Sequence, residues 1–81
     1  LTEERRKELV KVLNKKTEDA KIKIRNIRRE SNDKLEEYEN NGDISEDDYH
    51  RGLDNVQELT NKYEDKIDEL LEKKKEEIMT V

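Results

Sequence analysis

The stretch NNGDISEDD, residues 40–48, decides the fold of this chain, because it ends one helix and begins another. Gly42 suits the left-handed conformation that follows the last turn of many helices, and Asn41 is a second candidate for that position. Ser45 is a suitable N-cap, with Asp48 three residues later in a capping-box relation. The acids after Ser45 favour the positive N-terminus of a helix. So short a connection, over residues 41–45, predicts an antiparallel helical hairpin.

The sequence before this turn predicts one helix over about residues 3–40, roughly 55 Å long. Thr2 is a suitable N-cap, and no Pro or Gly occurs before Gly42. Apolar or small residues recur at steps of three or four, within an arc of about 80° on the helix. The stripe expected to be buried consists of Leu9, Leu13, Thr17, Ala20, Ile24, Ile27, Ser31, Leu35 and Tyr38.

The sequence after the turn predicts a second helix over about residues 46–79. Its stripe consists of Tyr49, Leu53, Val56, Thr60, Tyr63, Ile67, Leu70 and Lys74, widened to about 120° by Leu59, Leu71 and Ile78. Gly52 costs the helix up to ~1 kcal/mol but allows a close helix crossing.

Two helices alone bury only the line along which they touch, not a core. The apolar stripe of the second helix is wide enough to contact more than one neighbouring helix. We therefore expect an all-α chain whose residues 1–81 form a partial helical-bundle domain. A third helix would complete a three-helix bundle, or two hairpins would associate into a four-helix bundle.

The composition argues against an enzyme and against a membrane protein. Charged residues make up 51% of the chain and hydrophobic residues 28%, and no apolar run approaches the roughly 20 residues that cross a bilayer. Cys is absent, which fits a reducing compartment, and we expect a cytoplasmic protein. His50 is the single His, and the acids near the turn lack the order of a calcium loop. We expect no active site, no metal and no cofactor.

The charge is distributed unevenly, although the whole chain carries a net charge of −5. Residues 1–29 contain eleven Lys or Arg and five Asp or Glu, a net charge of +6, whereas residues 30–81 carry −11. Such asymmetry indicates an anionic partner for the basic part.

Five basic residues lie within the nine positions 21–29. On a helix, four of them form a contiguous surface beside the predicted stripe, with no acid between residues 20 and 29. We call this surface the basic flank: Lys21, Arg25, Arg28 and Arg29. Arginine side chains match phosphate oxygens bidentately, which suits an RNA backbone. The alternative is a solvated basic face that pairs with the acidic second helix.

The residues match the pattern of a known family at several places in the same order. They are LTEERRKEL at residues 1–9, RNIRRESNDK at residues 25–34, ISEDD at residues 44–48, QELT at residues 57–60 and KI at residues 66–67. Over the whole chain this resembles the C-terminal part of bacterial ribosome recycling factor. Glu30-Ser31 stands where Asp-Ala is more usual, and neither change removes a basic contact.

The resemblance implies an L-shaped protein with a three-helix bundle and a small β-rich domain inserted after its first helix. This chain would supply the second and third helices and would lack the first helix and the inserted domain. In the family the bundle binds the large ribosomal subunit and, with elongation factor G, splits ribosomes after termination. Because the inserted domain is implicated in working with elongation factor G, the present chain alone should not recycle ribosomes.

The resemblance also implies which residues contact large-subunit RNA. Arg25 and Arg28 match arginines associated with that contact, and Arg6 matches a further basic position of the bundle. With Lys21 and Arg29, they form the expected RNA-binding set. The competing interpretation is a structural coiled-coil hairpin or oligomerisation module without an RNA partner.

Overall fold

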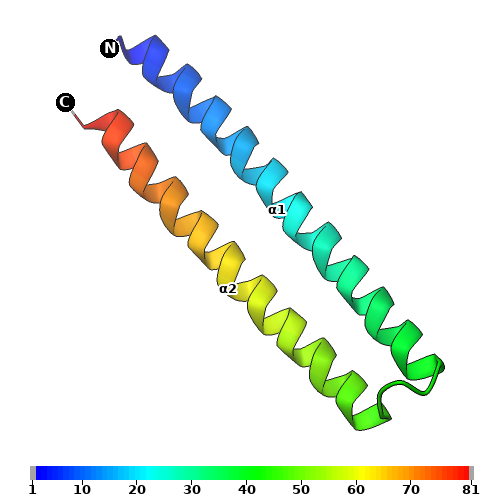
Figure 1. Ribbon diagram of the computed structural model, residues 1–81. Coiled ribbons are helices and arrows are strands. Elements are labelled where there is room, and N and C mark those ends of the chain that lie inside the picture. The colour runs from blue at the N-terminus through cyan, green and yellow to red at the C-terminus, as the bar shows by residue number, and fades with distance from the viewer. Residues whose placement is uncertain (1, 81) are drawn as a thin grey trace.

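The computed structural model describes residues 2–80 and consists of two helices joined by a short turn (Figure 1). Helix α1 spans Glu3–Asn40, and helix α2 spans Glu46–Met79. They run antiparallel with both termini at one end, in a hairpin with extents of 60 × 15 × 9 Å. The predicted all-α hairpin and the limits of both helices are confirmed.

Both helices begin with the caps that the sequence predicts. The Thr2 hydroxyl accepts a hydrogen bond of 3.1 Å from the backbone N–H of Arg5, and the Ser45 hydroxyl accepts one of 3.0 Å from Asp48. Each cap satisfies an N–H group that has no partner within its own helix.

The turn reverses the chain at Gly42, whose φ angle of 78° is positive. The Gly42 N–H donates to the carbonyl of Glu39 at 3.0 Å, and the Asp43 N–H donates to that of Tyr38 at 2.8 Å. This pair of bonds is the Schellman arrangement, in which the residue after the helix adopts the left-handed conformation. The position predicted for Gly42 is therefore confirmed.

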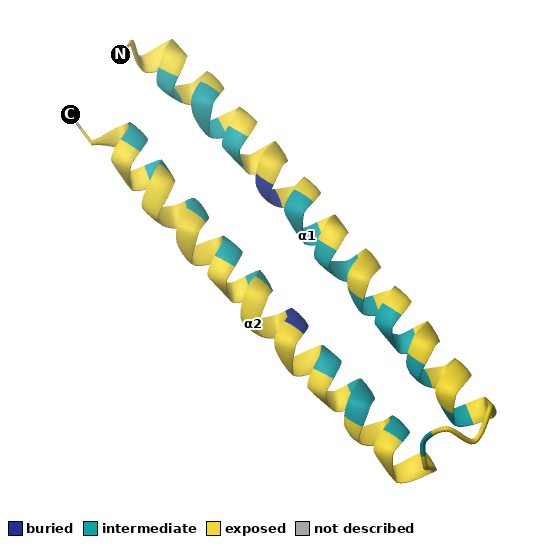
Figure 2. Ribbon diagram, in the orientation of Figure 1, coloured by how far each residue is buried: buried dark blue, intermediate teal, exposed yellow. Residues whose placement is uncertain are grey.

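The seam, the line along which the two helices touch, is thin and buries little. Among residues 2–80 only Thr17 and Thr60 are buried, and no apolar side chain is. Both hydroxyls donate to the carbonyl four residues earlier, at 2.9 Å and 2.8 Å, so neither is left unsatisfied. Figure 2 shows the half-buried residues as a line along the facing sides of the helices.

Part of the predicted stripe lies outside the seam. Five apolar residues of the predicted stripes are 48–61% exposed: Ile27, Tyr38, Leu59, Tyr63 and Leu70. Lys74, which we also placed in the stripe of the second helix, is exposed as well. The reason is geometric, because one neighbouring helix covers a narrower arc than these stripes occupy. The line of contact between the helices is displaced toward the side of α1 that carries Arg28, which is half-buried.

Across residues 2–80, neither helix is apolar enough over a sufficient length to cross a membrane.

Candidate nucleic-acid interface

The basic flank runs along one edge of the hairpin, and its four members differ in exposure. Lys21, Arg25 and Arg28 are half-buried, and Arg29 is exposed. Lys21 and Arg25 are four residues apart, so they lie one turn apart on the same side of α1. Two acids of α2, which are also four residues apart, face them across the seam: Glu64 and Asp68.

Lys21 is bound tightly to α2. Its Nζ lies 2.6 Å from Oδ1 of Asp68, and only 17% of its side chain is exposed. The hydrogen bond to Asp68 raises the pKa of Lys21 above its ordinary value of 10.5, although desolvation opposes the shift. Lys21 is therefore charged at neutral pH, but its ammonium already has a carboxylate partner.

Arg25 is bound in a different way. Its Nε donates to Oε1 of Glu64 at 3.2 Å, which makes both a hydrogen bond and an ion pair. The Arg25 side chain is 42% exposed, compared with 26% for Glu64. Nε carries one of the five N–H donors of a guanidinium, so the terminal nitrogens keep the other four.

For Lys21 and Arg25, the two ion pairs support the alternative interpretation, a basic face that pairs with the acidic second helix. No acid lies between residues 20 and 29, but α2 supplies acids from across the seam. In an antiparallel hairpin, a step of four residues forward on α1 matches a step of four backward on α2, which brings Lys21 to Asp68 and Arg25 to Glu64. The basic flank is thus partly paired with the acidic second helix.

Arg28 and Arg29 make no ion pair within residues 2–80. Arg28 lines an open apolar groove between the helices. Arg29 donates from a terminal nitrogen to Oδ1 of Asn26 at 3.2 Å, one turn back on α1. These two arginines keep their full positive charge available to an anionic ligand.

Arg6 does not join the basic flank. It lies fifteen residues before Lys21, which corresponds to roughly 22 Å along α1. Arg6 is half-buried, and its Nε is buried without a hydrogen-bond partner among the described residues. The structure therefore brings four of the five predicted cations together and leaves Arg6 apart.

An open apolar groove follows the seam, and Arg28 of the basic flank is among the residues that line it. One section has a volume of about 280 Å³ and is lined by Ile24, Ile27, Arg28, Ser31, Val56, Leu59, Thr60 and Tyr63. A second section, of about 180 Å³, is lined by Leu13, Lys16, Thr17, Ala20, Ile67, Leu70, Leu71 and Lys74. Ile27, Ala20 and Leu13 are spaced by seven residues, so the two sections continue one another along α1.

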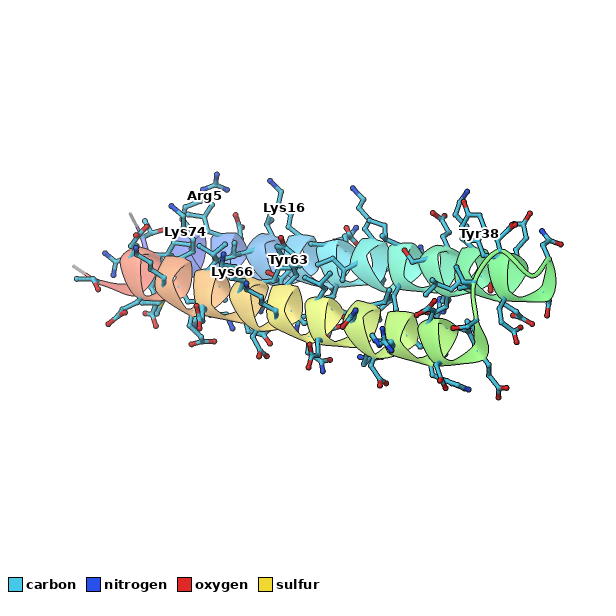
Figure 3. All side chains as sticks on the ribbon, turned by 60° about the horizontal axis from the view of Figure 1, so that its bottom comes forward. Arg5, Lys16, Tyr38, Tyr63, Lys66 and Lys74 are labelled. Carbon is cyan, nitrogen blue, oxygen red and sulfur yellow. The ribbon has the colours of Figure 1, made fainter. Side chains whose placement is uncertain are left out.

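A row of four exposed cations runs along α1 on the side of the helix that carries the groove, and our reading of the sequence missed it; Lys16 is the member that lines the groove. The row consists of Arg5, Lys16, Lys23 and Lys34, all exposed. Their spacings of 11, 7 and 11 residues each bring the helix back to within about 20° of the same direction. Figure 3 shows Arg5 and Lys16 extending from the same side of α1. The repeated spacing was the signal available in the sequence.

Within residues 2–80, no group of three or more His, Cys, Asp or Glu side chains is placed to hold a metal ion. His50 lies on the exposed face of α2, where its Nε2 is 3.7 Å from Oε1 of Glu46 in the preceding turn.

The sequence is similar to proteins of one family along its whole length. The sequence model of a family described as "Ribosome recycling factor" matches residues 1–79. A ribosome-recycling factor of Halothermothrix orenii is 65% identical over all 81 residues, and those of Oceanobacillus iheyensis and Bacillus subtilis are 56% and 53% identical. In each case the match covers 100% of this chain and 44% of the relative. The chain thus spans less than half the length of these relatives.

Proposed function

The chain belongs to the ribosome recycling factor family, and from this premise we propose that it is a ribosome-binding part of such a factor. Its role is to hold the factor on the RNA of the large ribosomal subunit. The complete factor uses that position, together with elongation factor G, to separate ribosomal subunits after termination. The role requires no chemical step from this chain, which acts by binding in the cytoplasm.

The observation that carries this proposal is the concentration of arginine on one edge of α1. Arg25, Arg28 and Arg29 lie within five positions. Arg28 and Arg29 have no acid partner within residues 2–80, and Arg25 engages its partner through Nε alone. Phosphate oxygens accept bidentate hydrogen bonds from guanidinium groups, so this edge suits an RNA backbone.

The five cations divide into three groups by their contacts and positions. Arg25, Arg28 and Arg29 are the residues we assign to phosphate contact. Lys21 has one nitrogen, which Asp68 already binds at 2.6 Å, so we assign it chiefly to joining the helices. Arg6 lies too far along α1 to share a phosphate with the others, and it would contact RNA separately.

We also propose that a third helix packs into the open groove. The curated relatives are more than twice as long as this chain, and the resemblance implies a three-helix bundle. Exposed side chains such as Ile27, Tyr63 and Leu70 would be covered by such a helix. Because Lys16 lines the groove and Lys23 and Lys34 share its direction on α1, acidic residues on the flank of that helix would complement them. Elongation factor G would act through parts of the relatives that this chain does not match.

Binding to purified large ribosomal subunits tests the proposed function. Arg28→Ala should lower the affinity by about tenfold, because a charge-assisted contact to phosphate is lost. Lys15→Ala is the matched control, since Lys15 is an exposed cation on the outer face of α1. Circular dichroism should give equal helicity for both variants. Equal affinities of Arg28→Ala, Lys15→Ala and the unaltered chain would refute the assignment.

The competing function is a structural hairpin or oligomerisation module. Two observations favour it, namely the cross-helix pairs of Lys21 and Arg25 and the open apolar groove. It requires that charge reversal at Arg28 or Arg29 leaves binding to large subunits unchanged. The same measurement therefore decides between the two functions.

A further inference from the structure

The contact between Arg25 and Glu64 leaves the RNA-binding part of the arginine unused. Glu64 accepts from Nε at 3.2 Å, and Nε lies on the inner side of the guanidinium, next to the aliphatic chain. The two terminal nitrogens, with four N–H groups, form the outer end of the side chain. Since Arg25 is more exposed than Glu64, the acid lies deeper along the seam than the arginine that it binds.

We infer that Glu64 is a positioning residue for RNA binding, which holds Arg25 so that its terminal nitrogens face a phosphate. The inference rests on the proposed function, because it concerns how Arg25 meets the same ligand. Arginine has a long, flexible side chain, and ordering it upon binding opposes association. A side chain already fixed at Nε loses less freedom when its outer nitrogens engage a phosphate.

The neighbouring pair of Lys21 and Asp68 provides the contrast. A lysine carries all three of its N–H donors on one nitrogen, so a phosphate would have to approach the same atom that the acid binds. Lys21 Nζ lies 2.6 Å from Asp68 and its side chain is 17% exposed, so a phosphate would have little access to this nitrogen and would lie close to the carboxylate. Of the two cations bound across the seam, Arg25 is the one whose remaining donors lie on other atoms than the one its acid partner binds, and it is the more exposed.

Glu64 has two opposing effects on RNA binding, which substitutions can separate. Its negative charge repels phosphates, and its hydrogen bond orders Arg25. Glu64→Gln removes the charge but keeps an oxygen that accepts from Nε, whereas Glu64→Leu removes both. The two variants have the same charge, so the difference between them reports the hydrogen bond alone.

The test compares the affinity of these variants for purified large ribosomal subunits at a fixed salt concentration. Glu64→Gln should bind at least as tightly as the unaltered chain, and Glu64→Leu about three- to tenfold more weakly than Glu64→Gln. In an Arg25→Ala background the two should bind equally, since no guanidinium remains to be held. Glu69→Gln and Glu69→Leu are the matched controls, at an exposed acid of α2, and should bind equally.

The outcomes separate this inference from the proposed function. If Arg25→Ala weakens binding while Glu64→Leu binds as tightly as Glu64→Gln, the positioning role is refuted and the RNA-binding role stands. If Arg25→Ala and Arg28→Ala both bind like the unaltered chain, both proposals are refuted. A difference between Gln and Leu that persists without Arg25 also refutes the positioning role, because it must then arise elsewhere.

Discussion

Gly52 of α2 lies directly against Leu35 of α1, so closely that a Cβ atom at position 52 would be 2.9 Å from Cδ2 of Leu35. The helix accepts a glycine here although it costs up to ~1 kcal/mol in helix propensity. In return the two helices approach closely near the turn, as the sequence led us to expect. The two residues are therefore energetically coupled.

The first prediction concerns this coupling. Gly52→Ala alone should change the free energy of unfolding by less than about 1 kcal/mol, because the gain in propensity is offset by displacement of the Leu35 methyl groups. In a Leu35→Ala background the same substitution should stabilise the chain by about 1 kcal/mol, since the obstacle is gone. Urea unfolding followed by circular dichroism measures both values. If Gly52→Ala changes the free energy of unfolding equally in the two backgrounds, the contact with Leu35 does not determine its effect.

The second prediction concerns the pH dependence of the pair formed by Lys21 and Asp68. The pKa of Lys21 is raised in the folded state, so the folded chain holds this proton more tightly than the unfolded chain. Its contribution to stability is complete below the ordinary pKa of 10.5 and is lost as the pH rises through the folded pKa. The unaltered chain should thus be more stable than Lys21→Met at pH 8.

The measurement is urea unfolding of both chains between pH 8 and pH 12. The stability difference between them should shrink above pH 10.5, where Lys21 begins to lose its proton. Other lysines and tyrosines titrate in the same range, but they are common to both chains. A difference that stays constant over the whole range would contradict the assigned ion pair.

The helix limits and the turn could be predicted because caps act locally. Ser45 and Gly42 bind backbone groups within a few residues of themselves, and sequence alone identifies such partners. The direction of the seam could not be predicted in the same way. The periodic spacing places Ile27 and Tyr63 on the apolar faces of their helices. It does not tell how wide an arc of each face a single partner helix covers, because that depends on packing.

The ion pairs of the candidate site could not be predicted from the sequence of α1 alone. Lys21 and Arg25 form a basic surface by their spacing, and this much was predicted. Their acid partners lie 47 and 39 residues away, at Asp68 and Glu64, and the register of the hairpin brings them together. A turn longer or shorter by two residues would have placed other side chains opposite them.

The third prediction concerns the open groove. Leu70 is 60% exposed in this chain, so Leu70→Glu should change the free energy of unfolding by no more than about 0.5 kcal/mol. The chain should then be grafted in place of the matching segment of the full-length Halothermothrix orenii relative. There a third helix would cover position 70, and the same substitution should cost about 2 kcal/mol or more.

Ile22→Glu is the control for the groove, because Ile22 is 50% exposed and does not line it. It should have a small effect in both settings. If Leu70→Glu is equally harmless in the grafted protein, the groove is not the seat of a helix. If Leu70→Glu dissociates an oligomer of the 81-residue chain, which light scattering would detect, a second copy occupies the groove in that chain.

The central claim is that the arginine edge binds RNA phosphates, and the salt dependence of binding tests it most directly. The affinity of the chain for purified large ribosomal subunits should be measured over a series of salt concentrations, alongside that of an Arg25→Ala/Arg28→Ala variant. Each phosphate neutralised contributes about 0.7–0.9 to the slope of log affinity against log salt, so the variant should bind more weakly with a slope shallower by about 1.5. The same slope and the same affinity for both chains would contradict the claim.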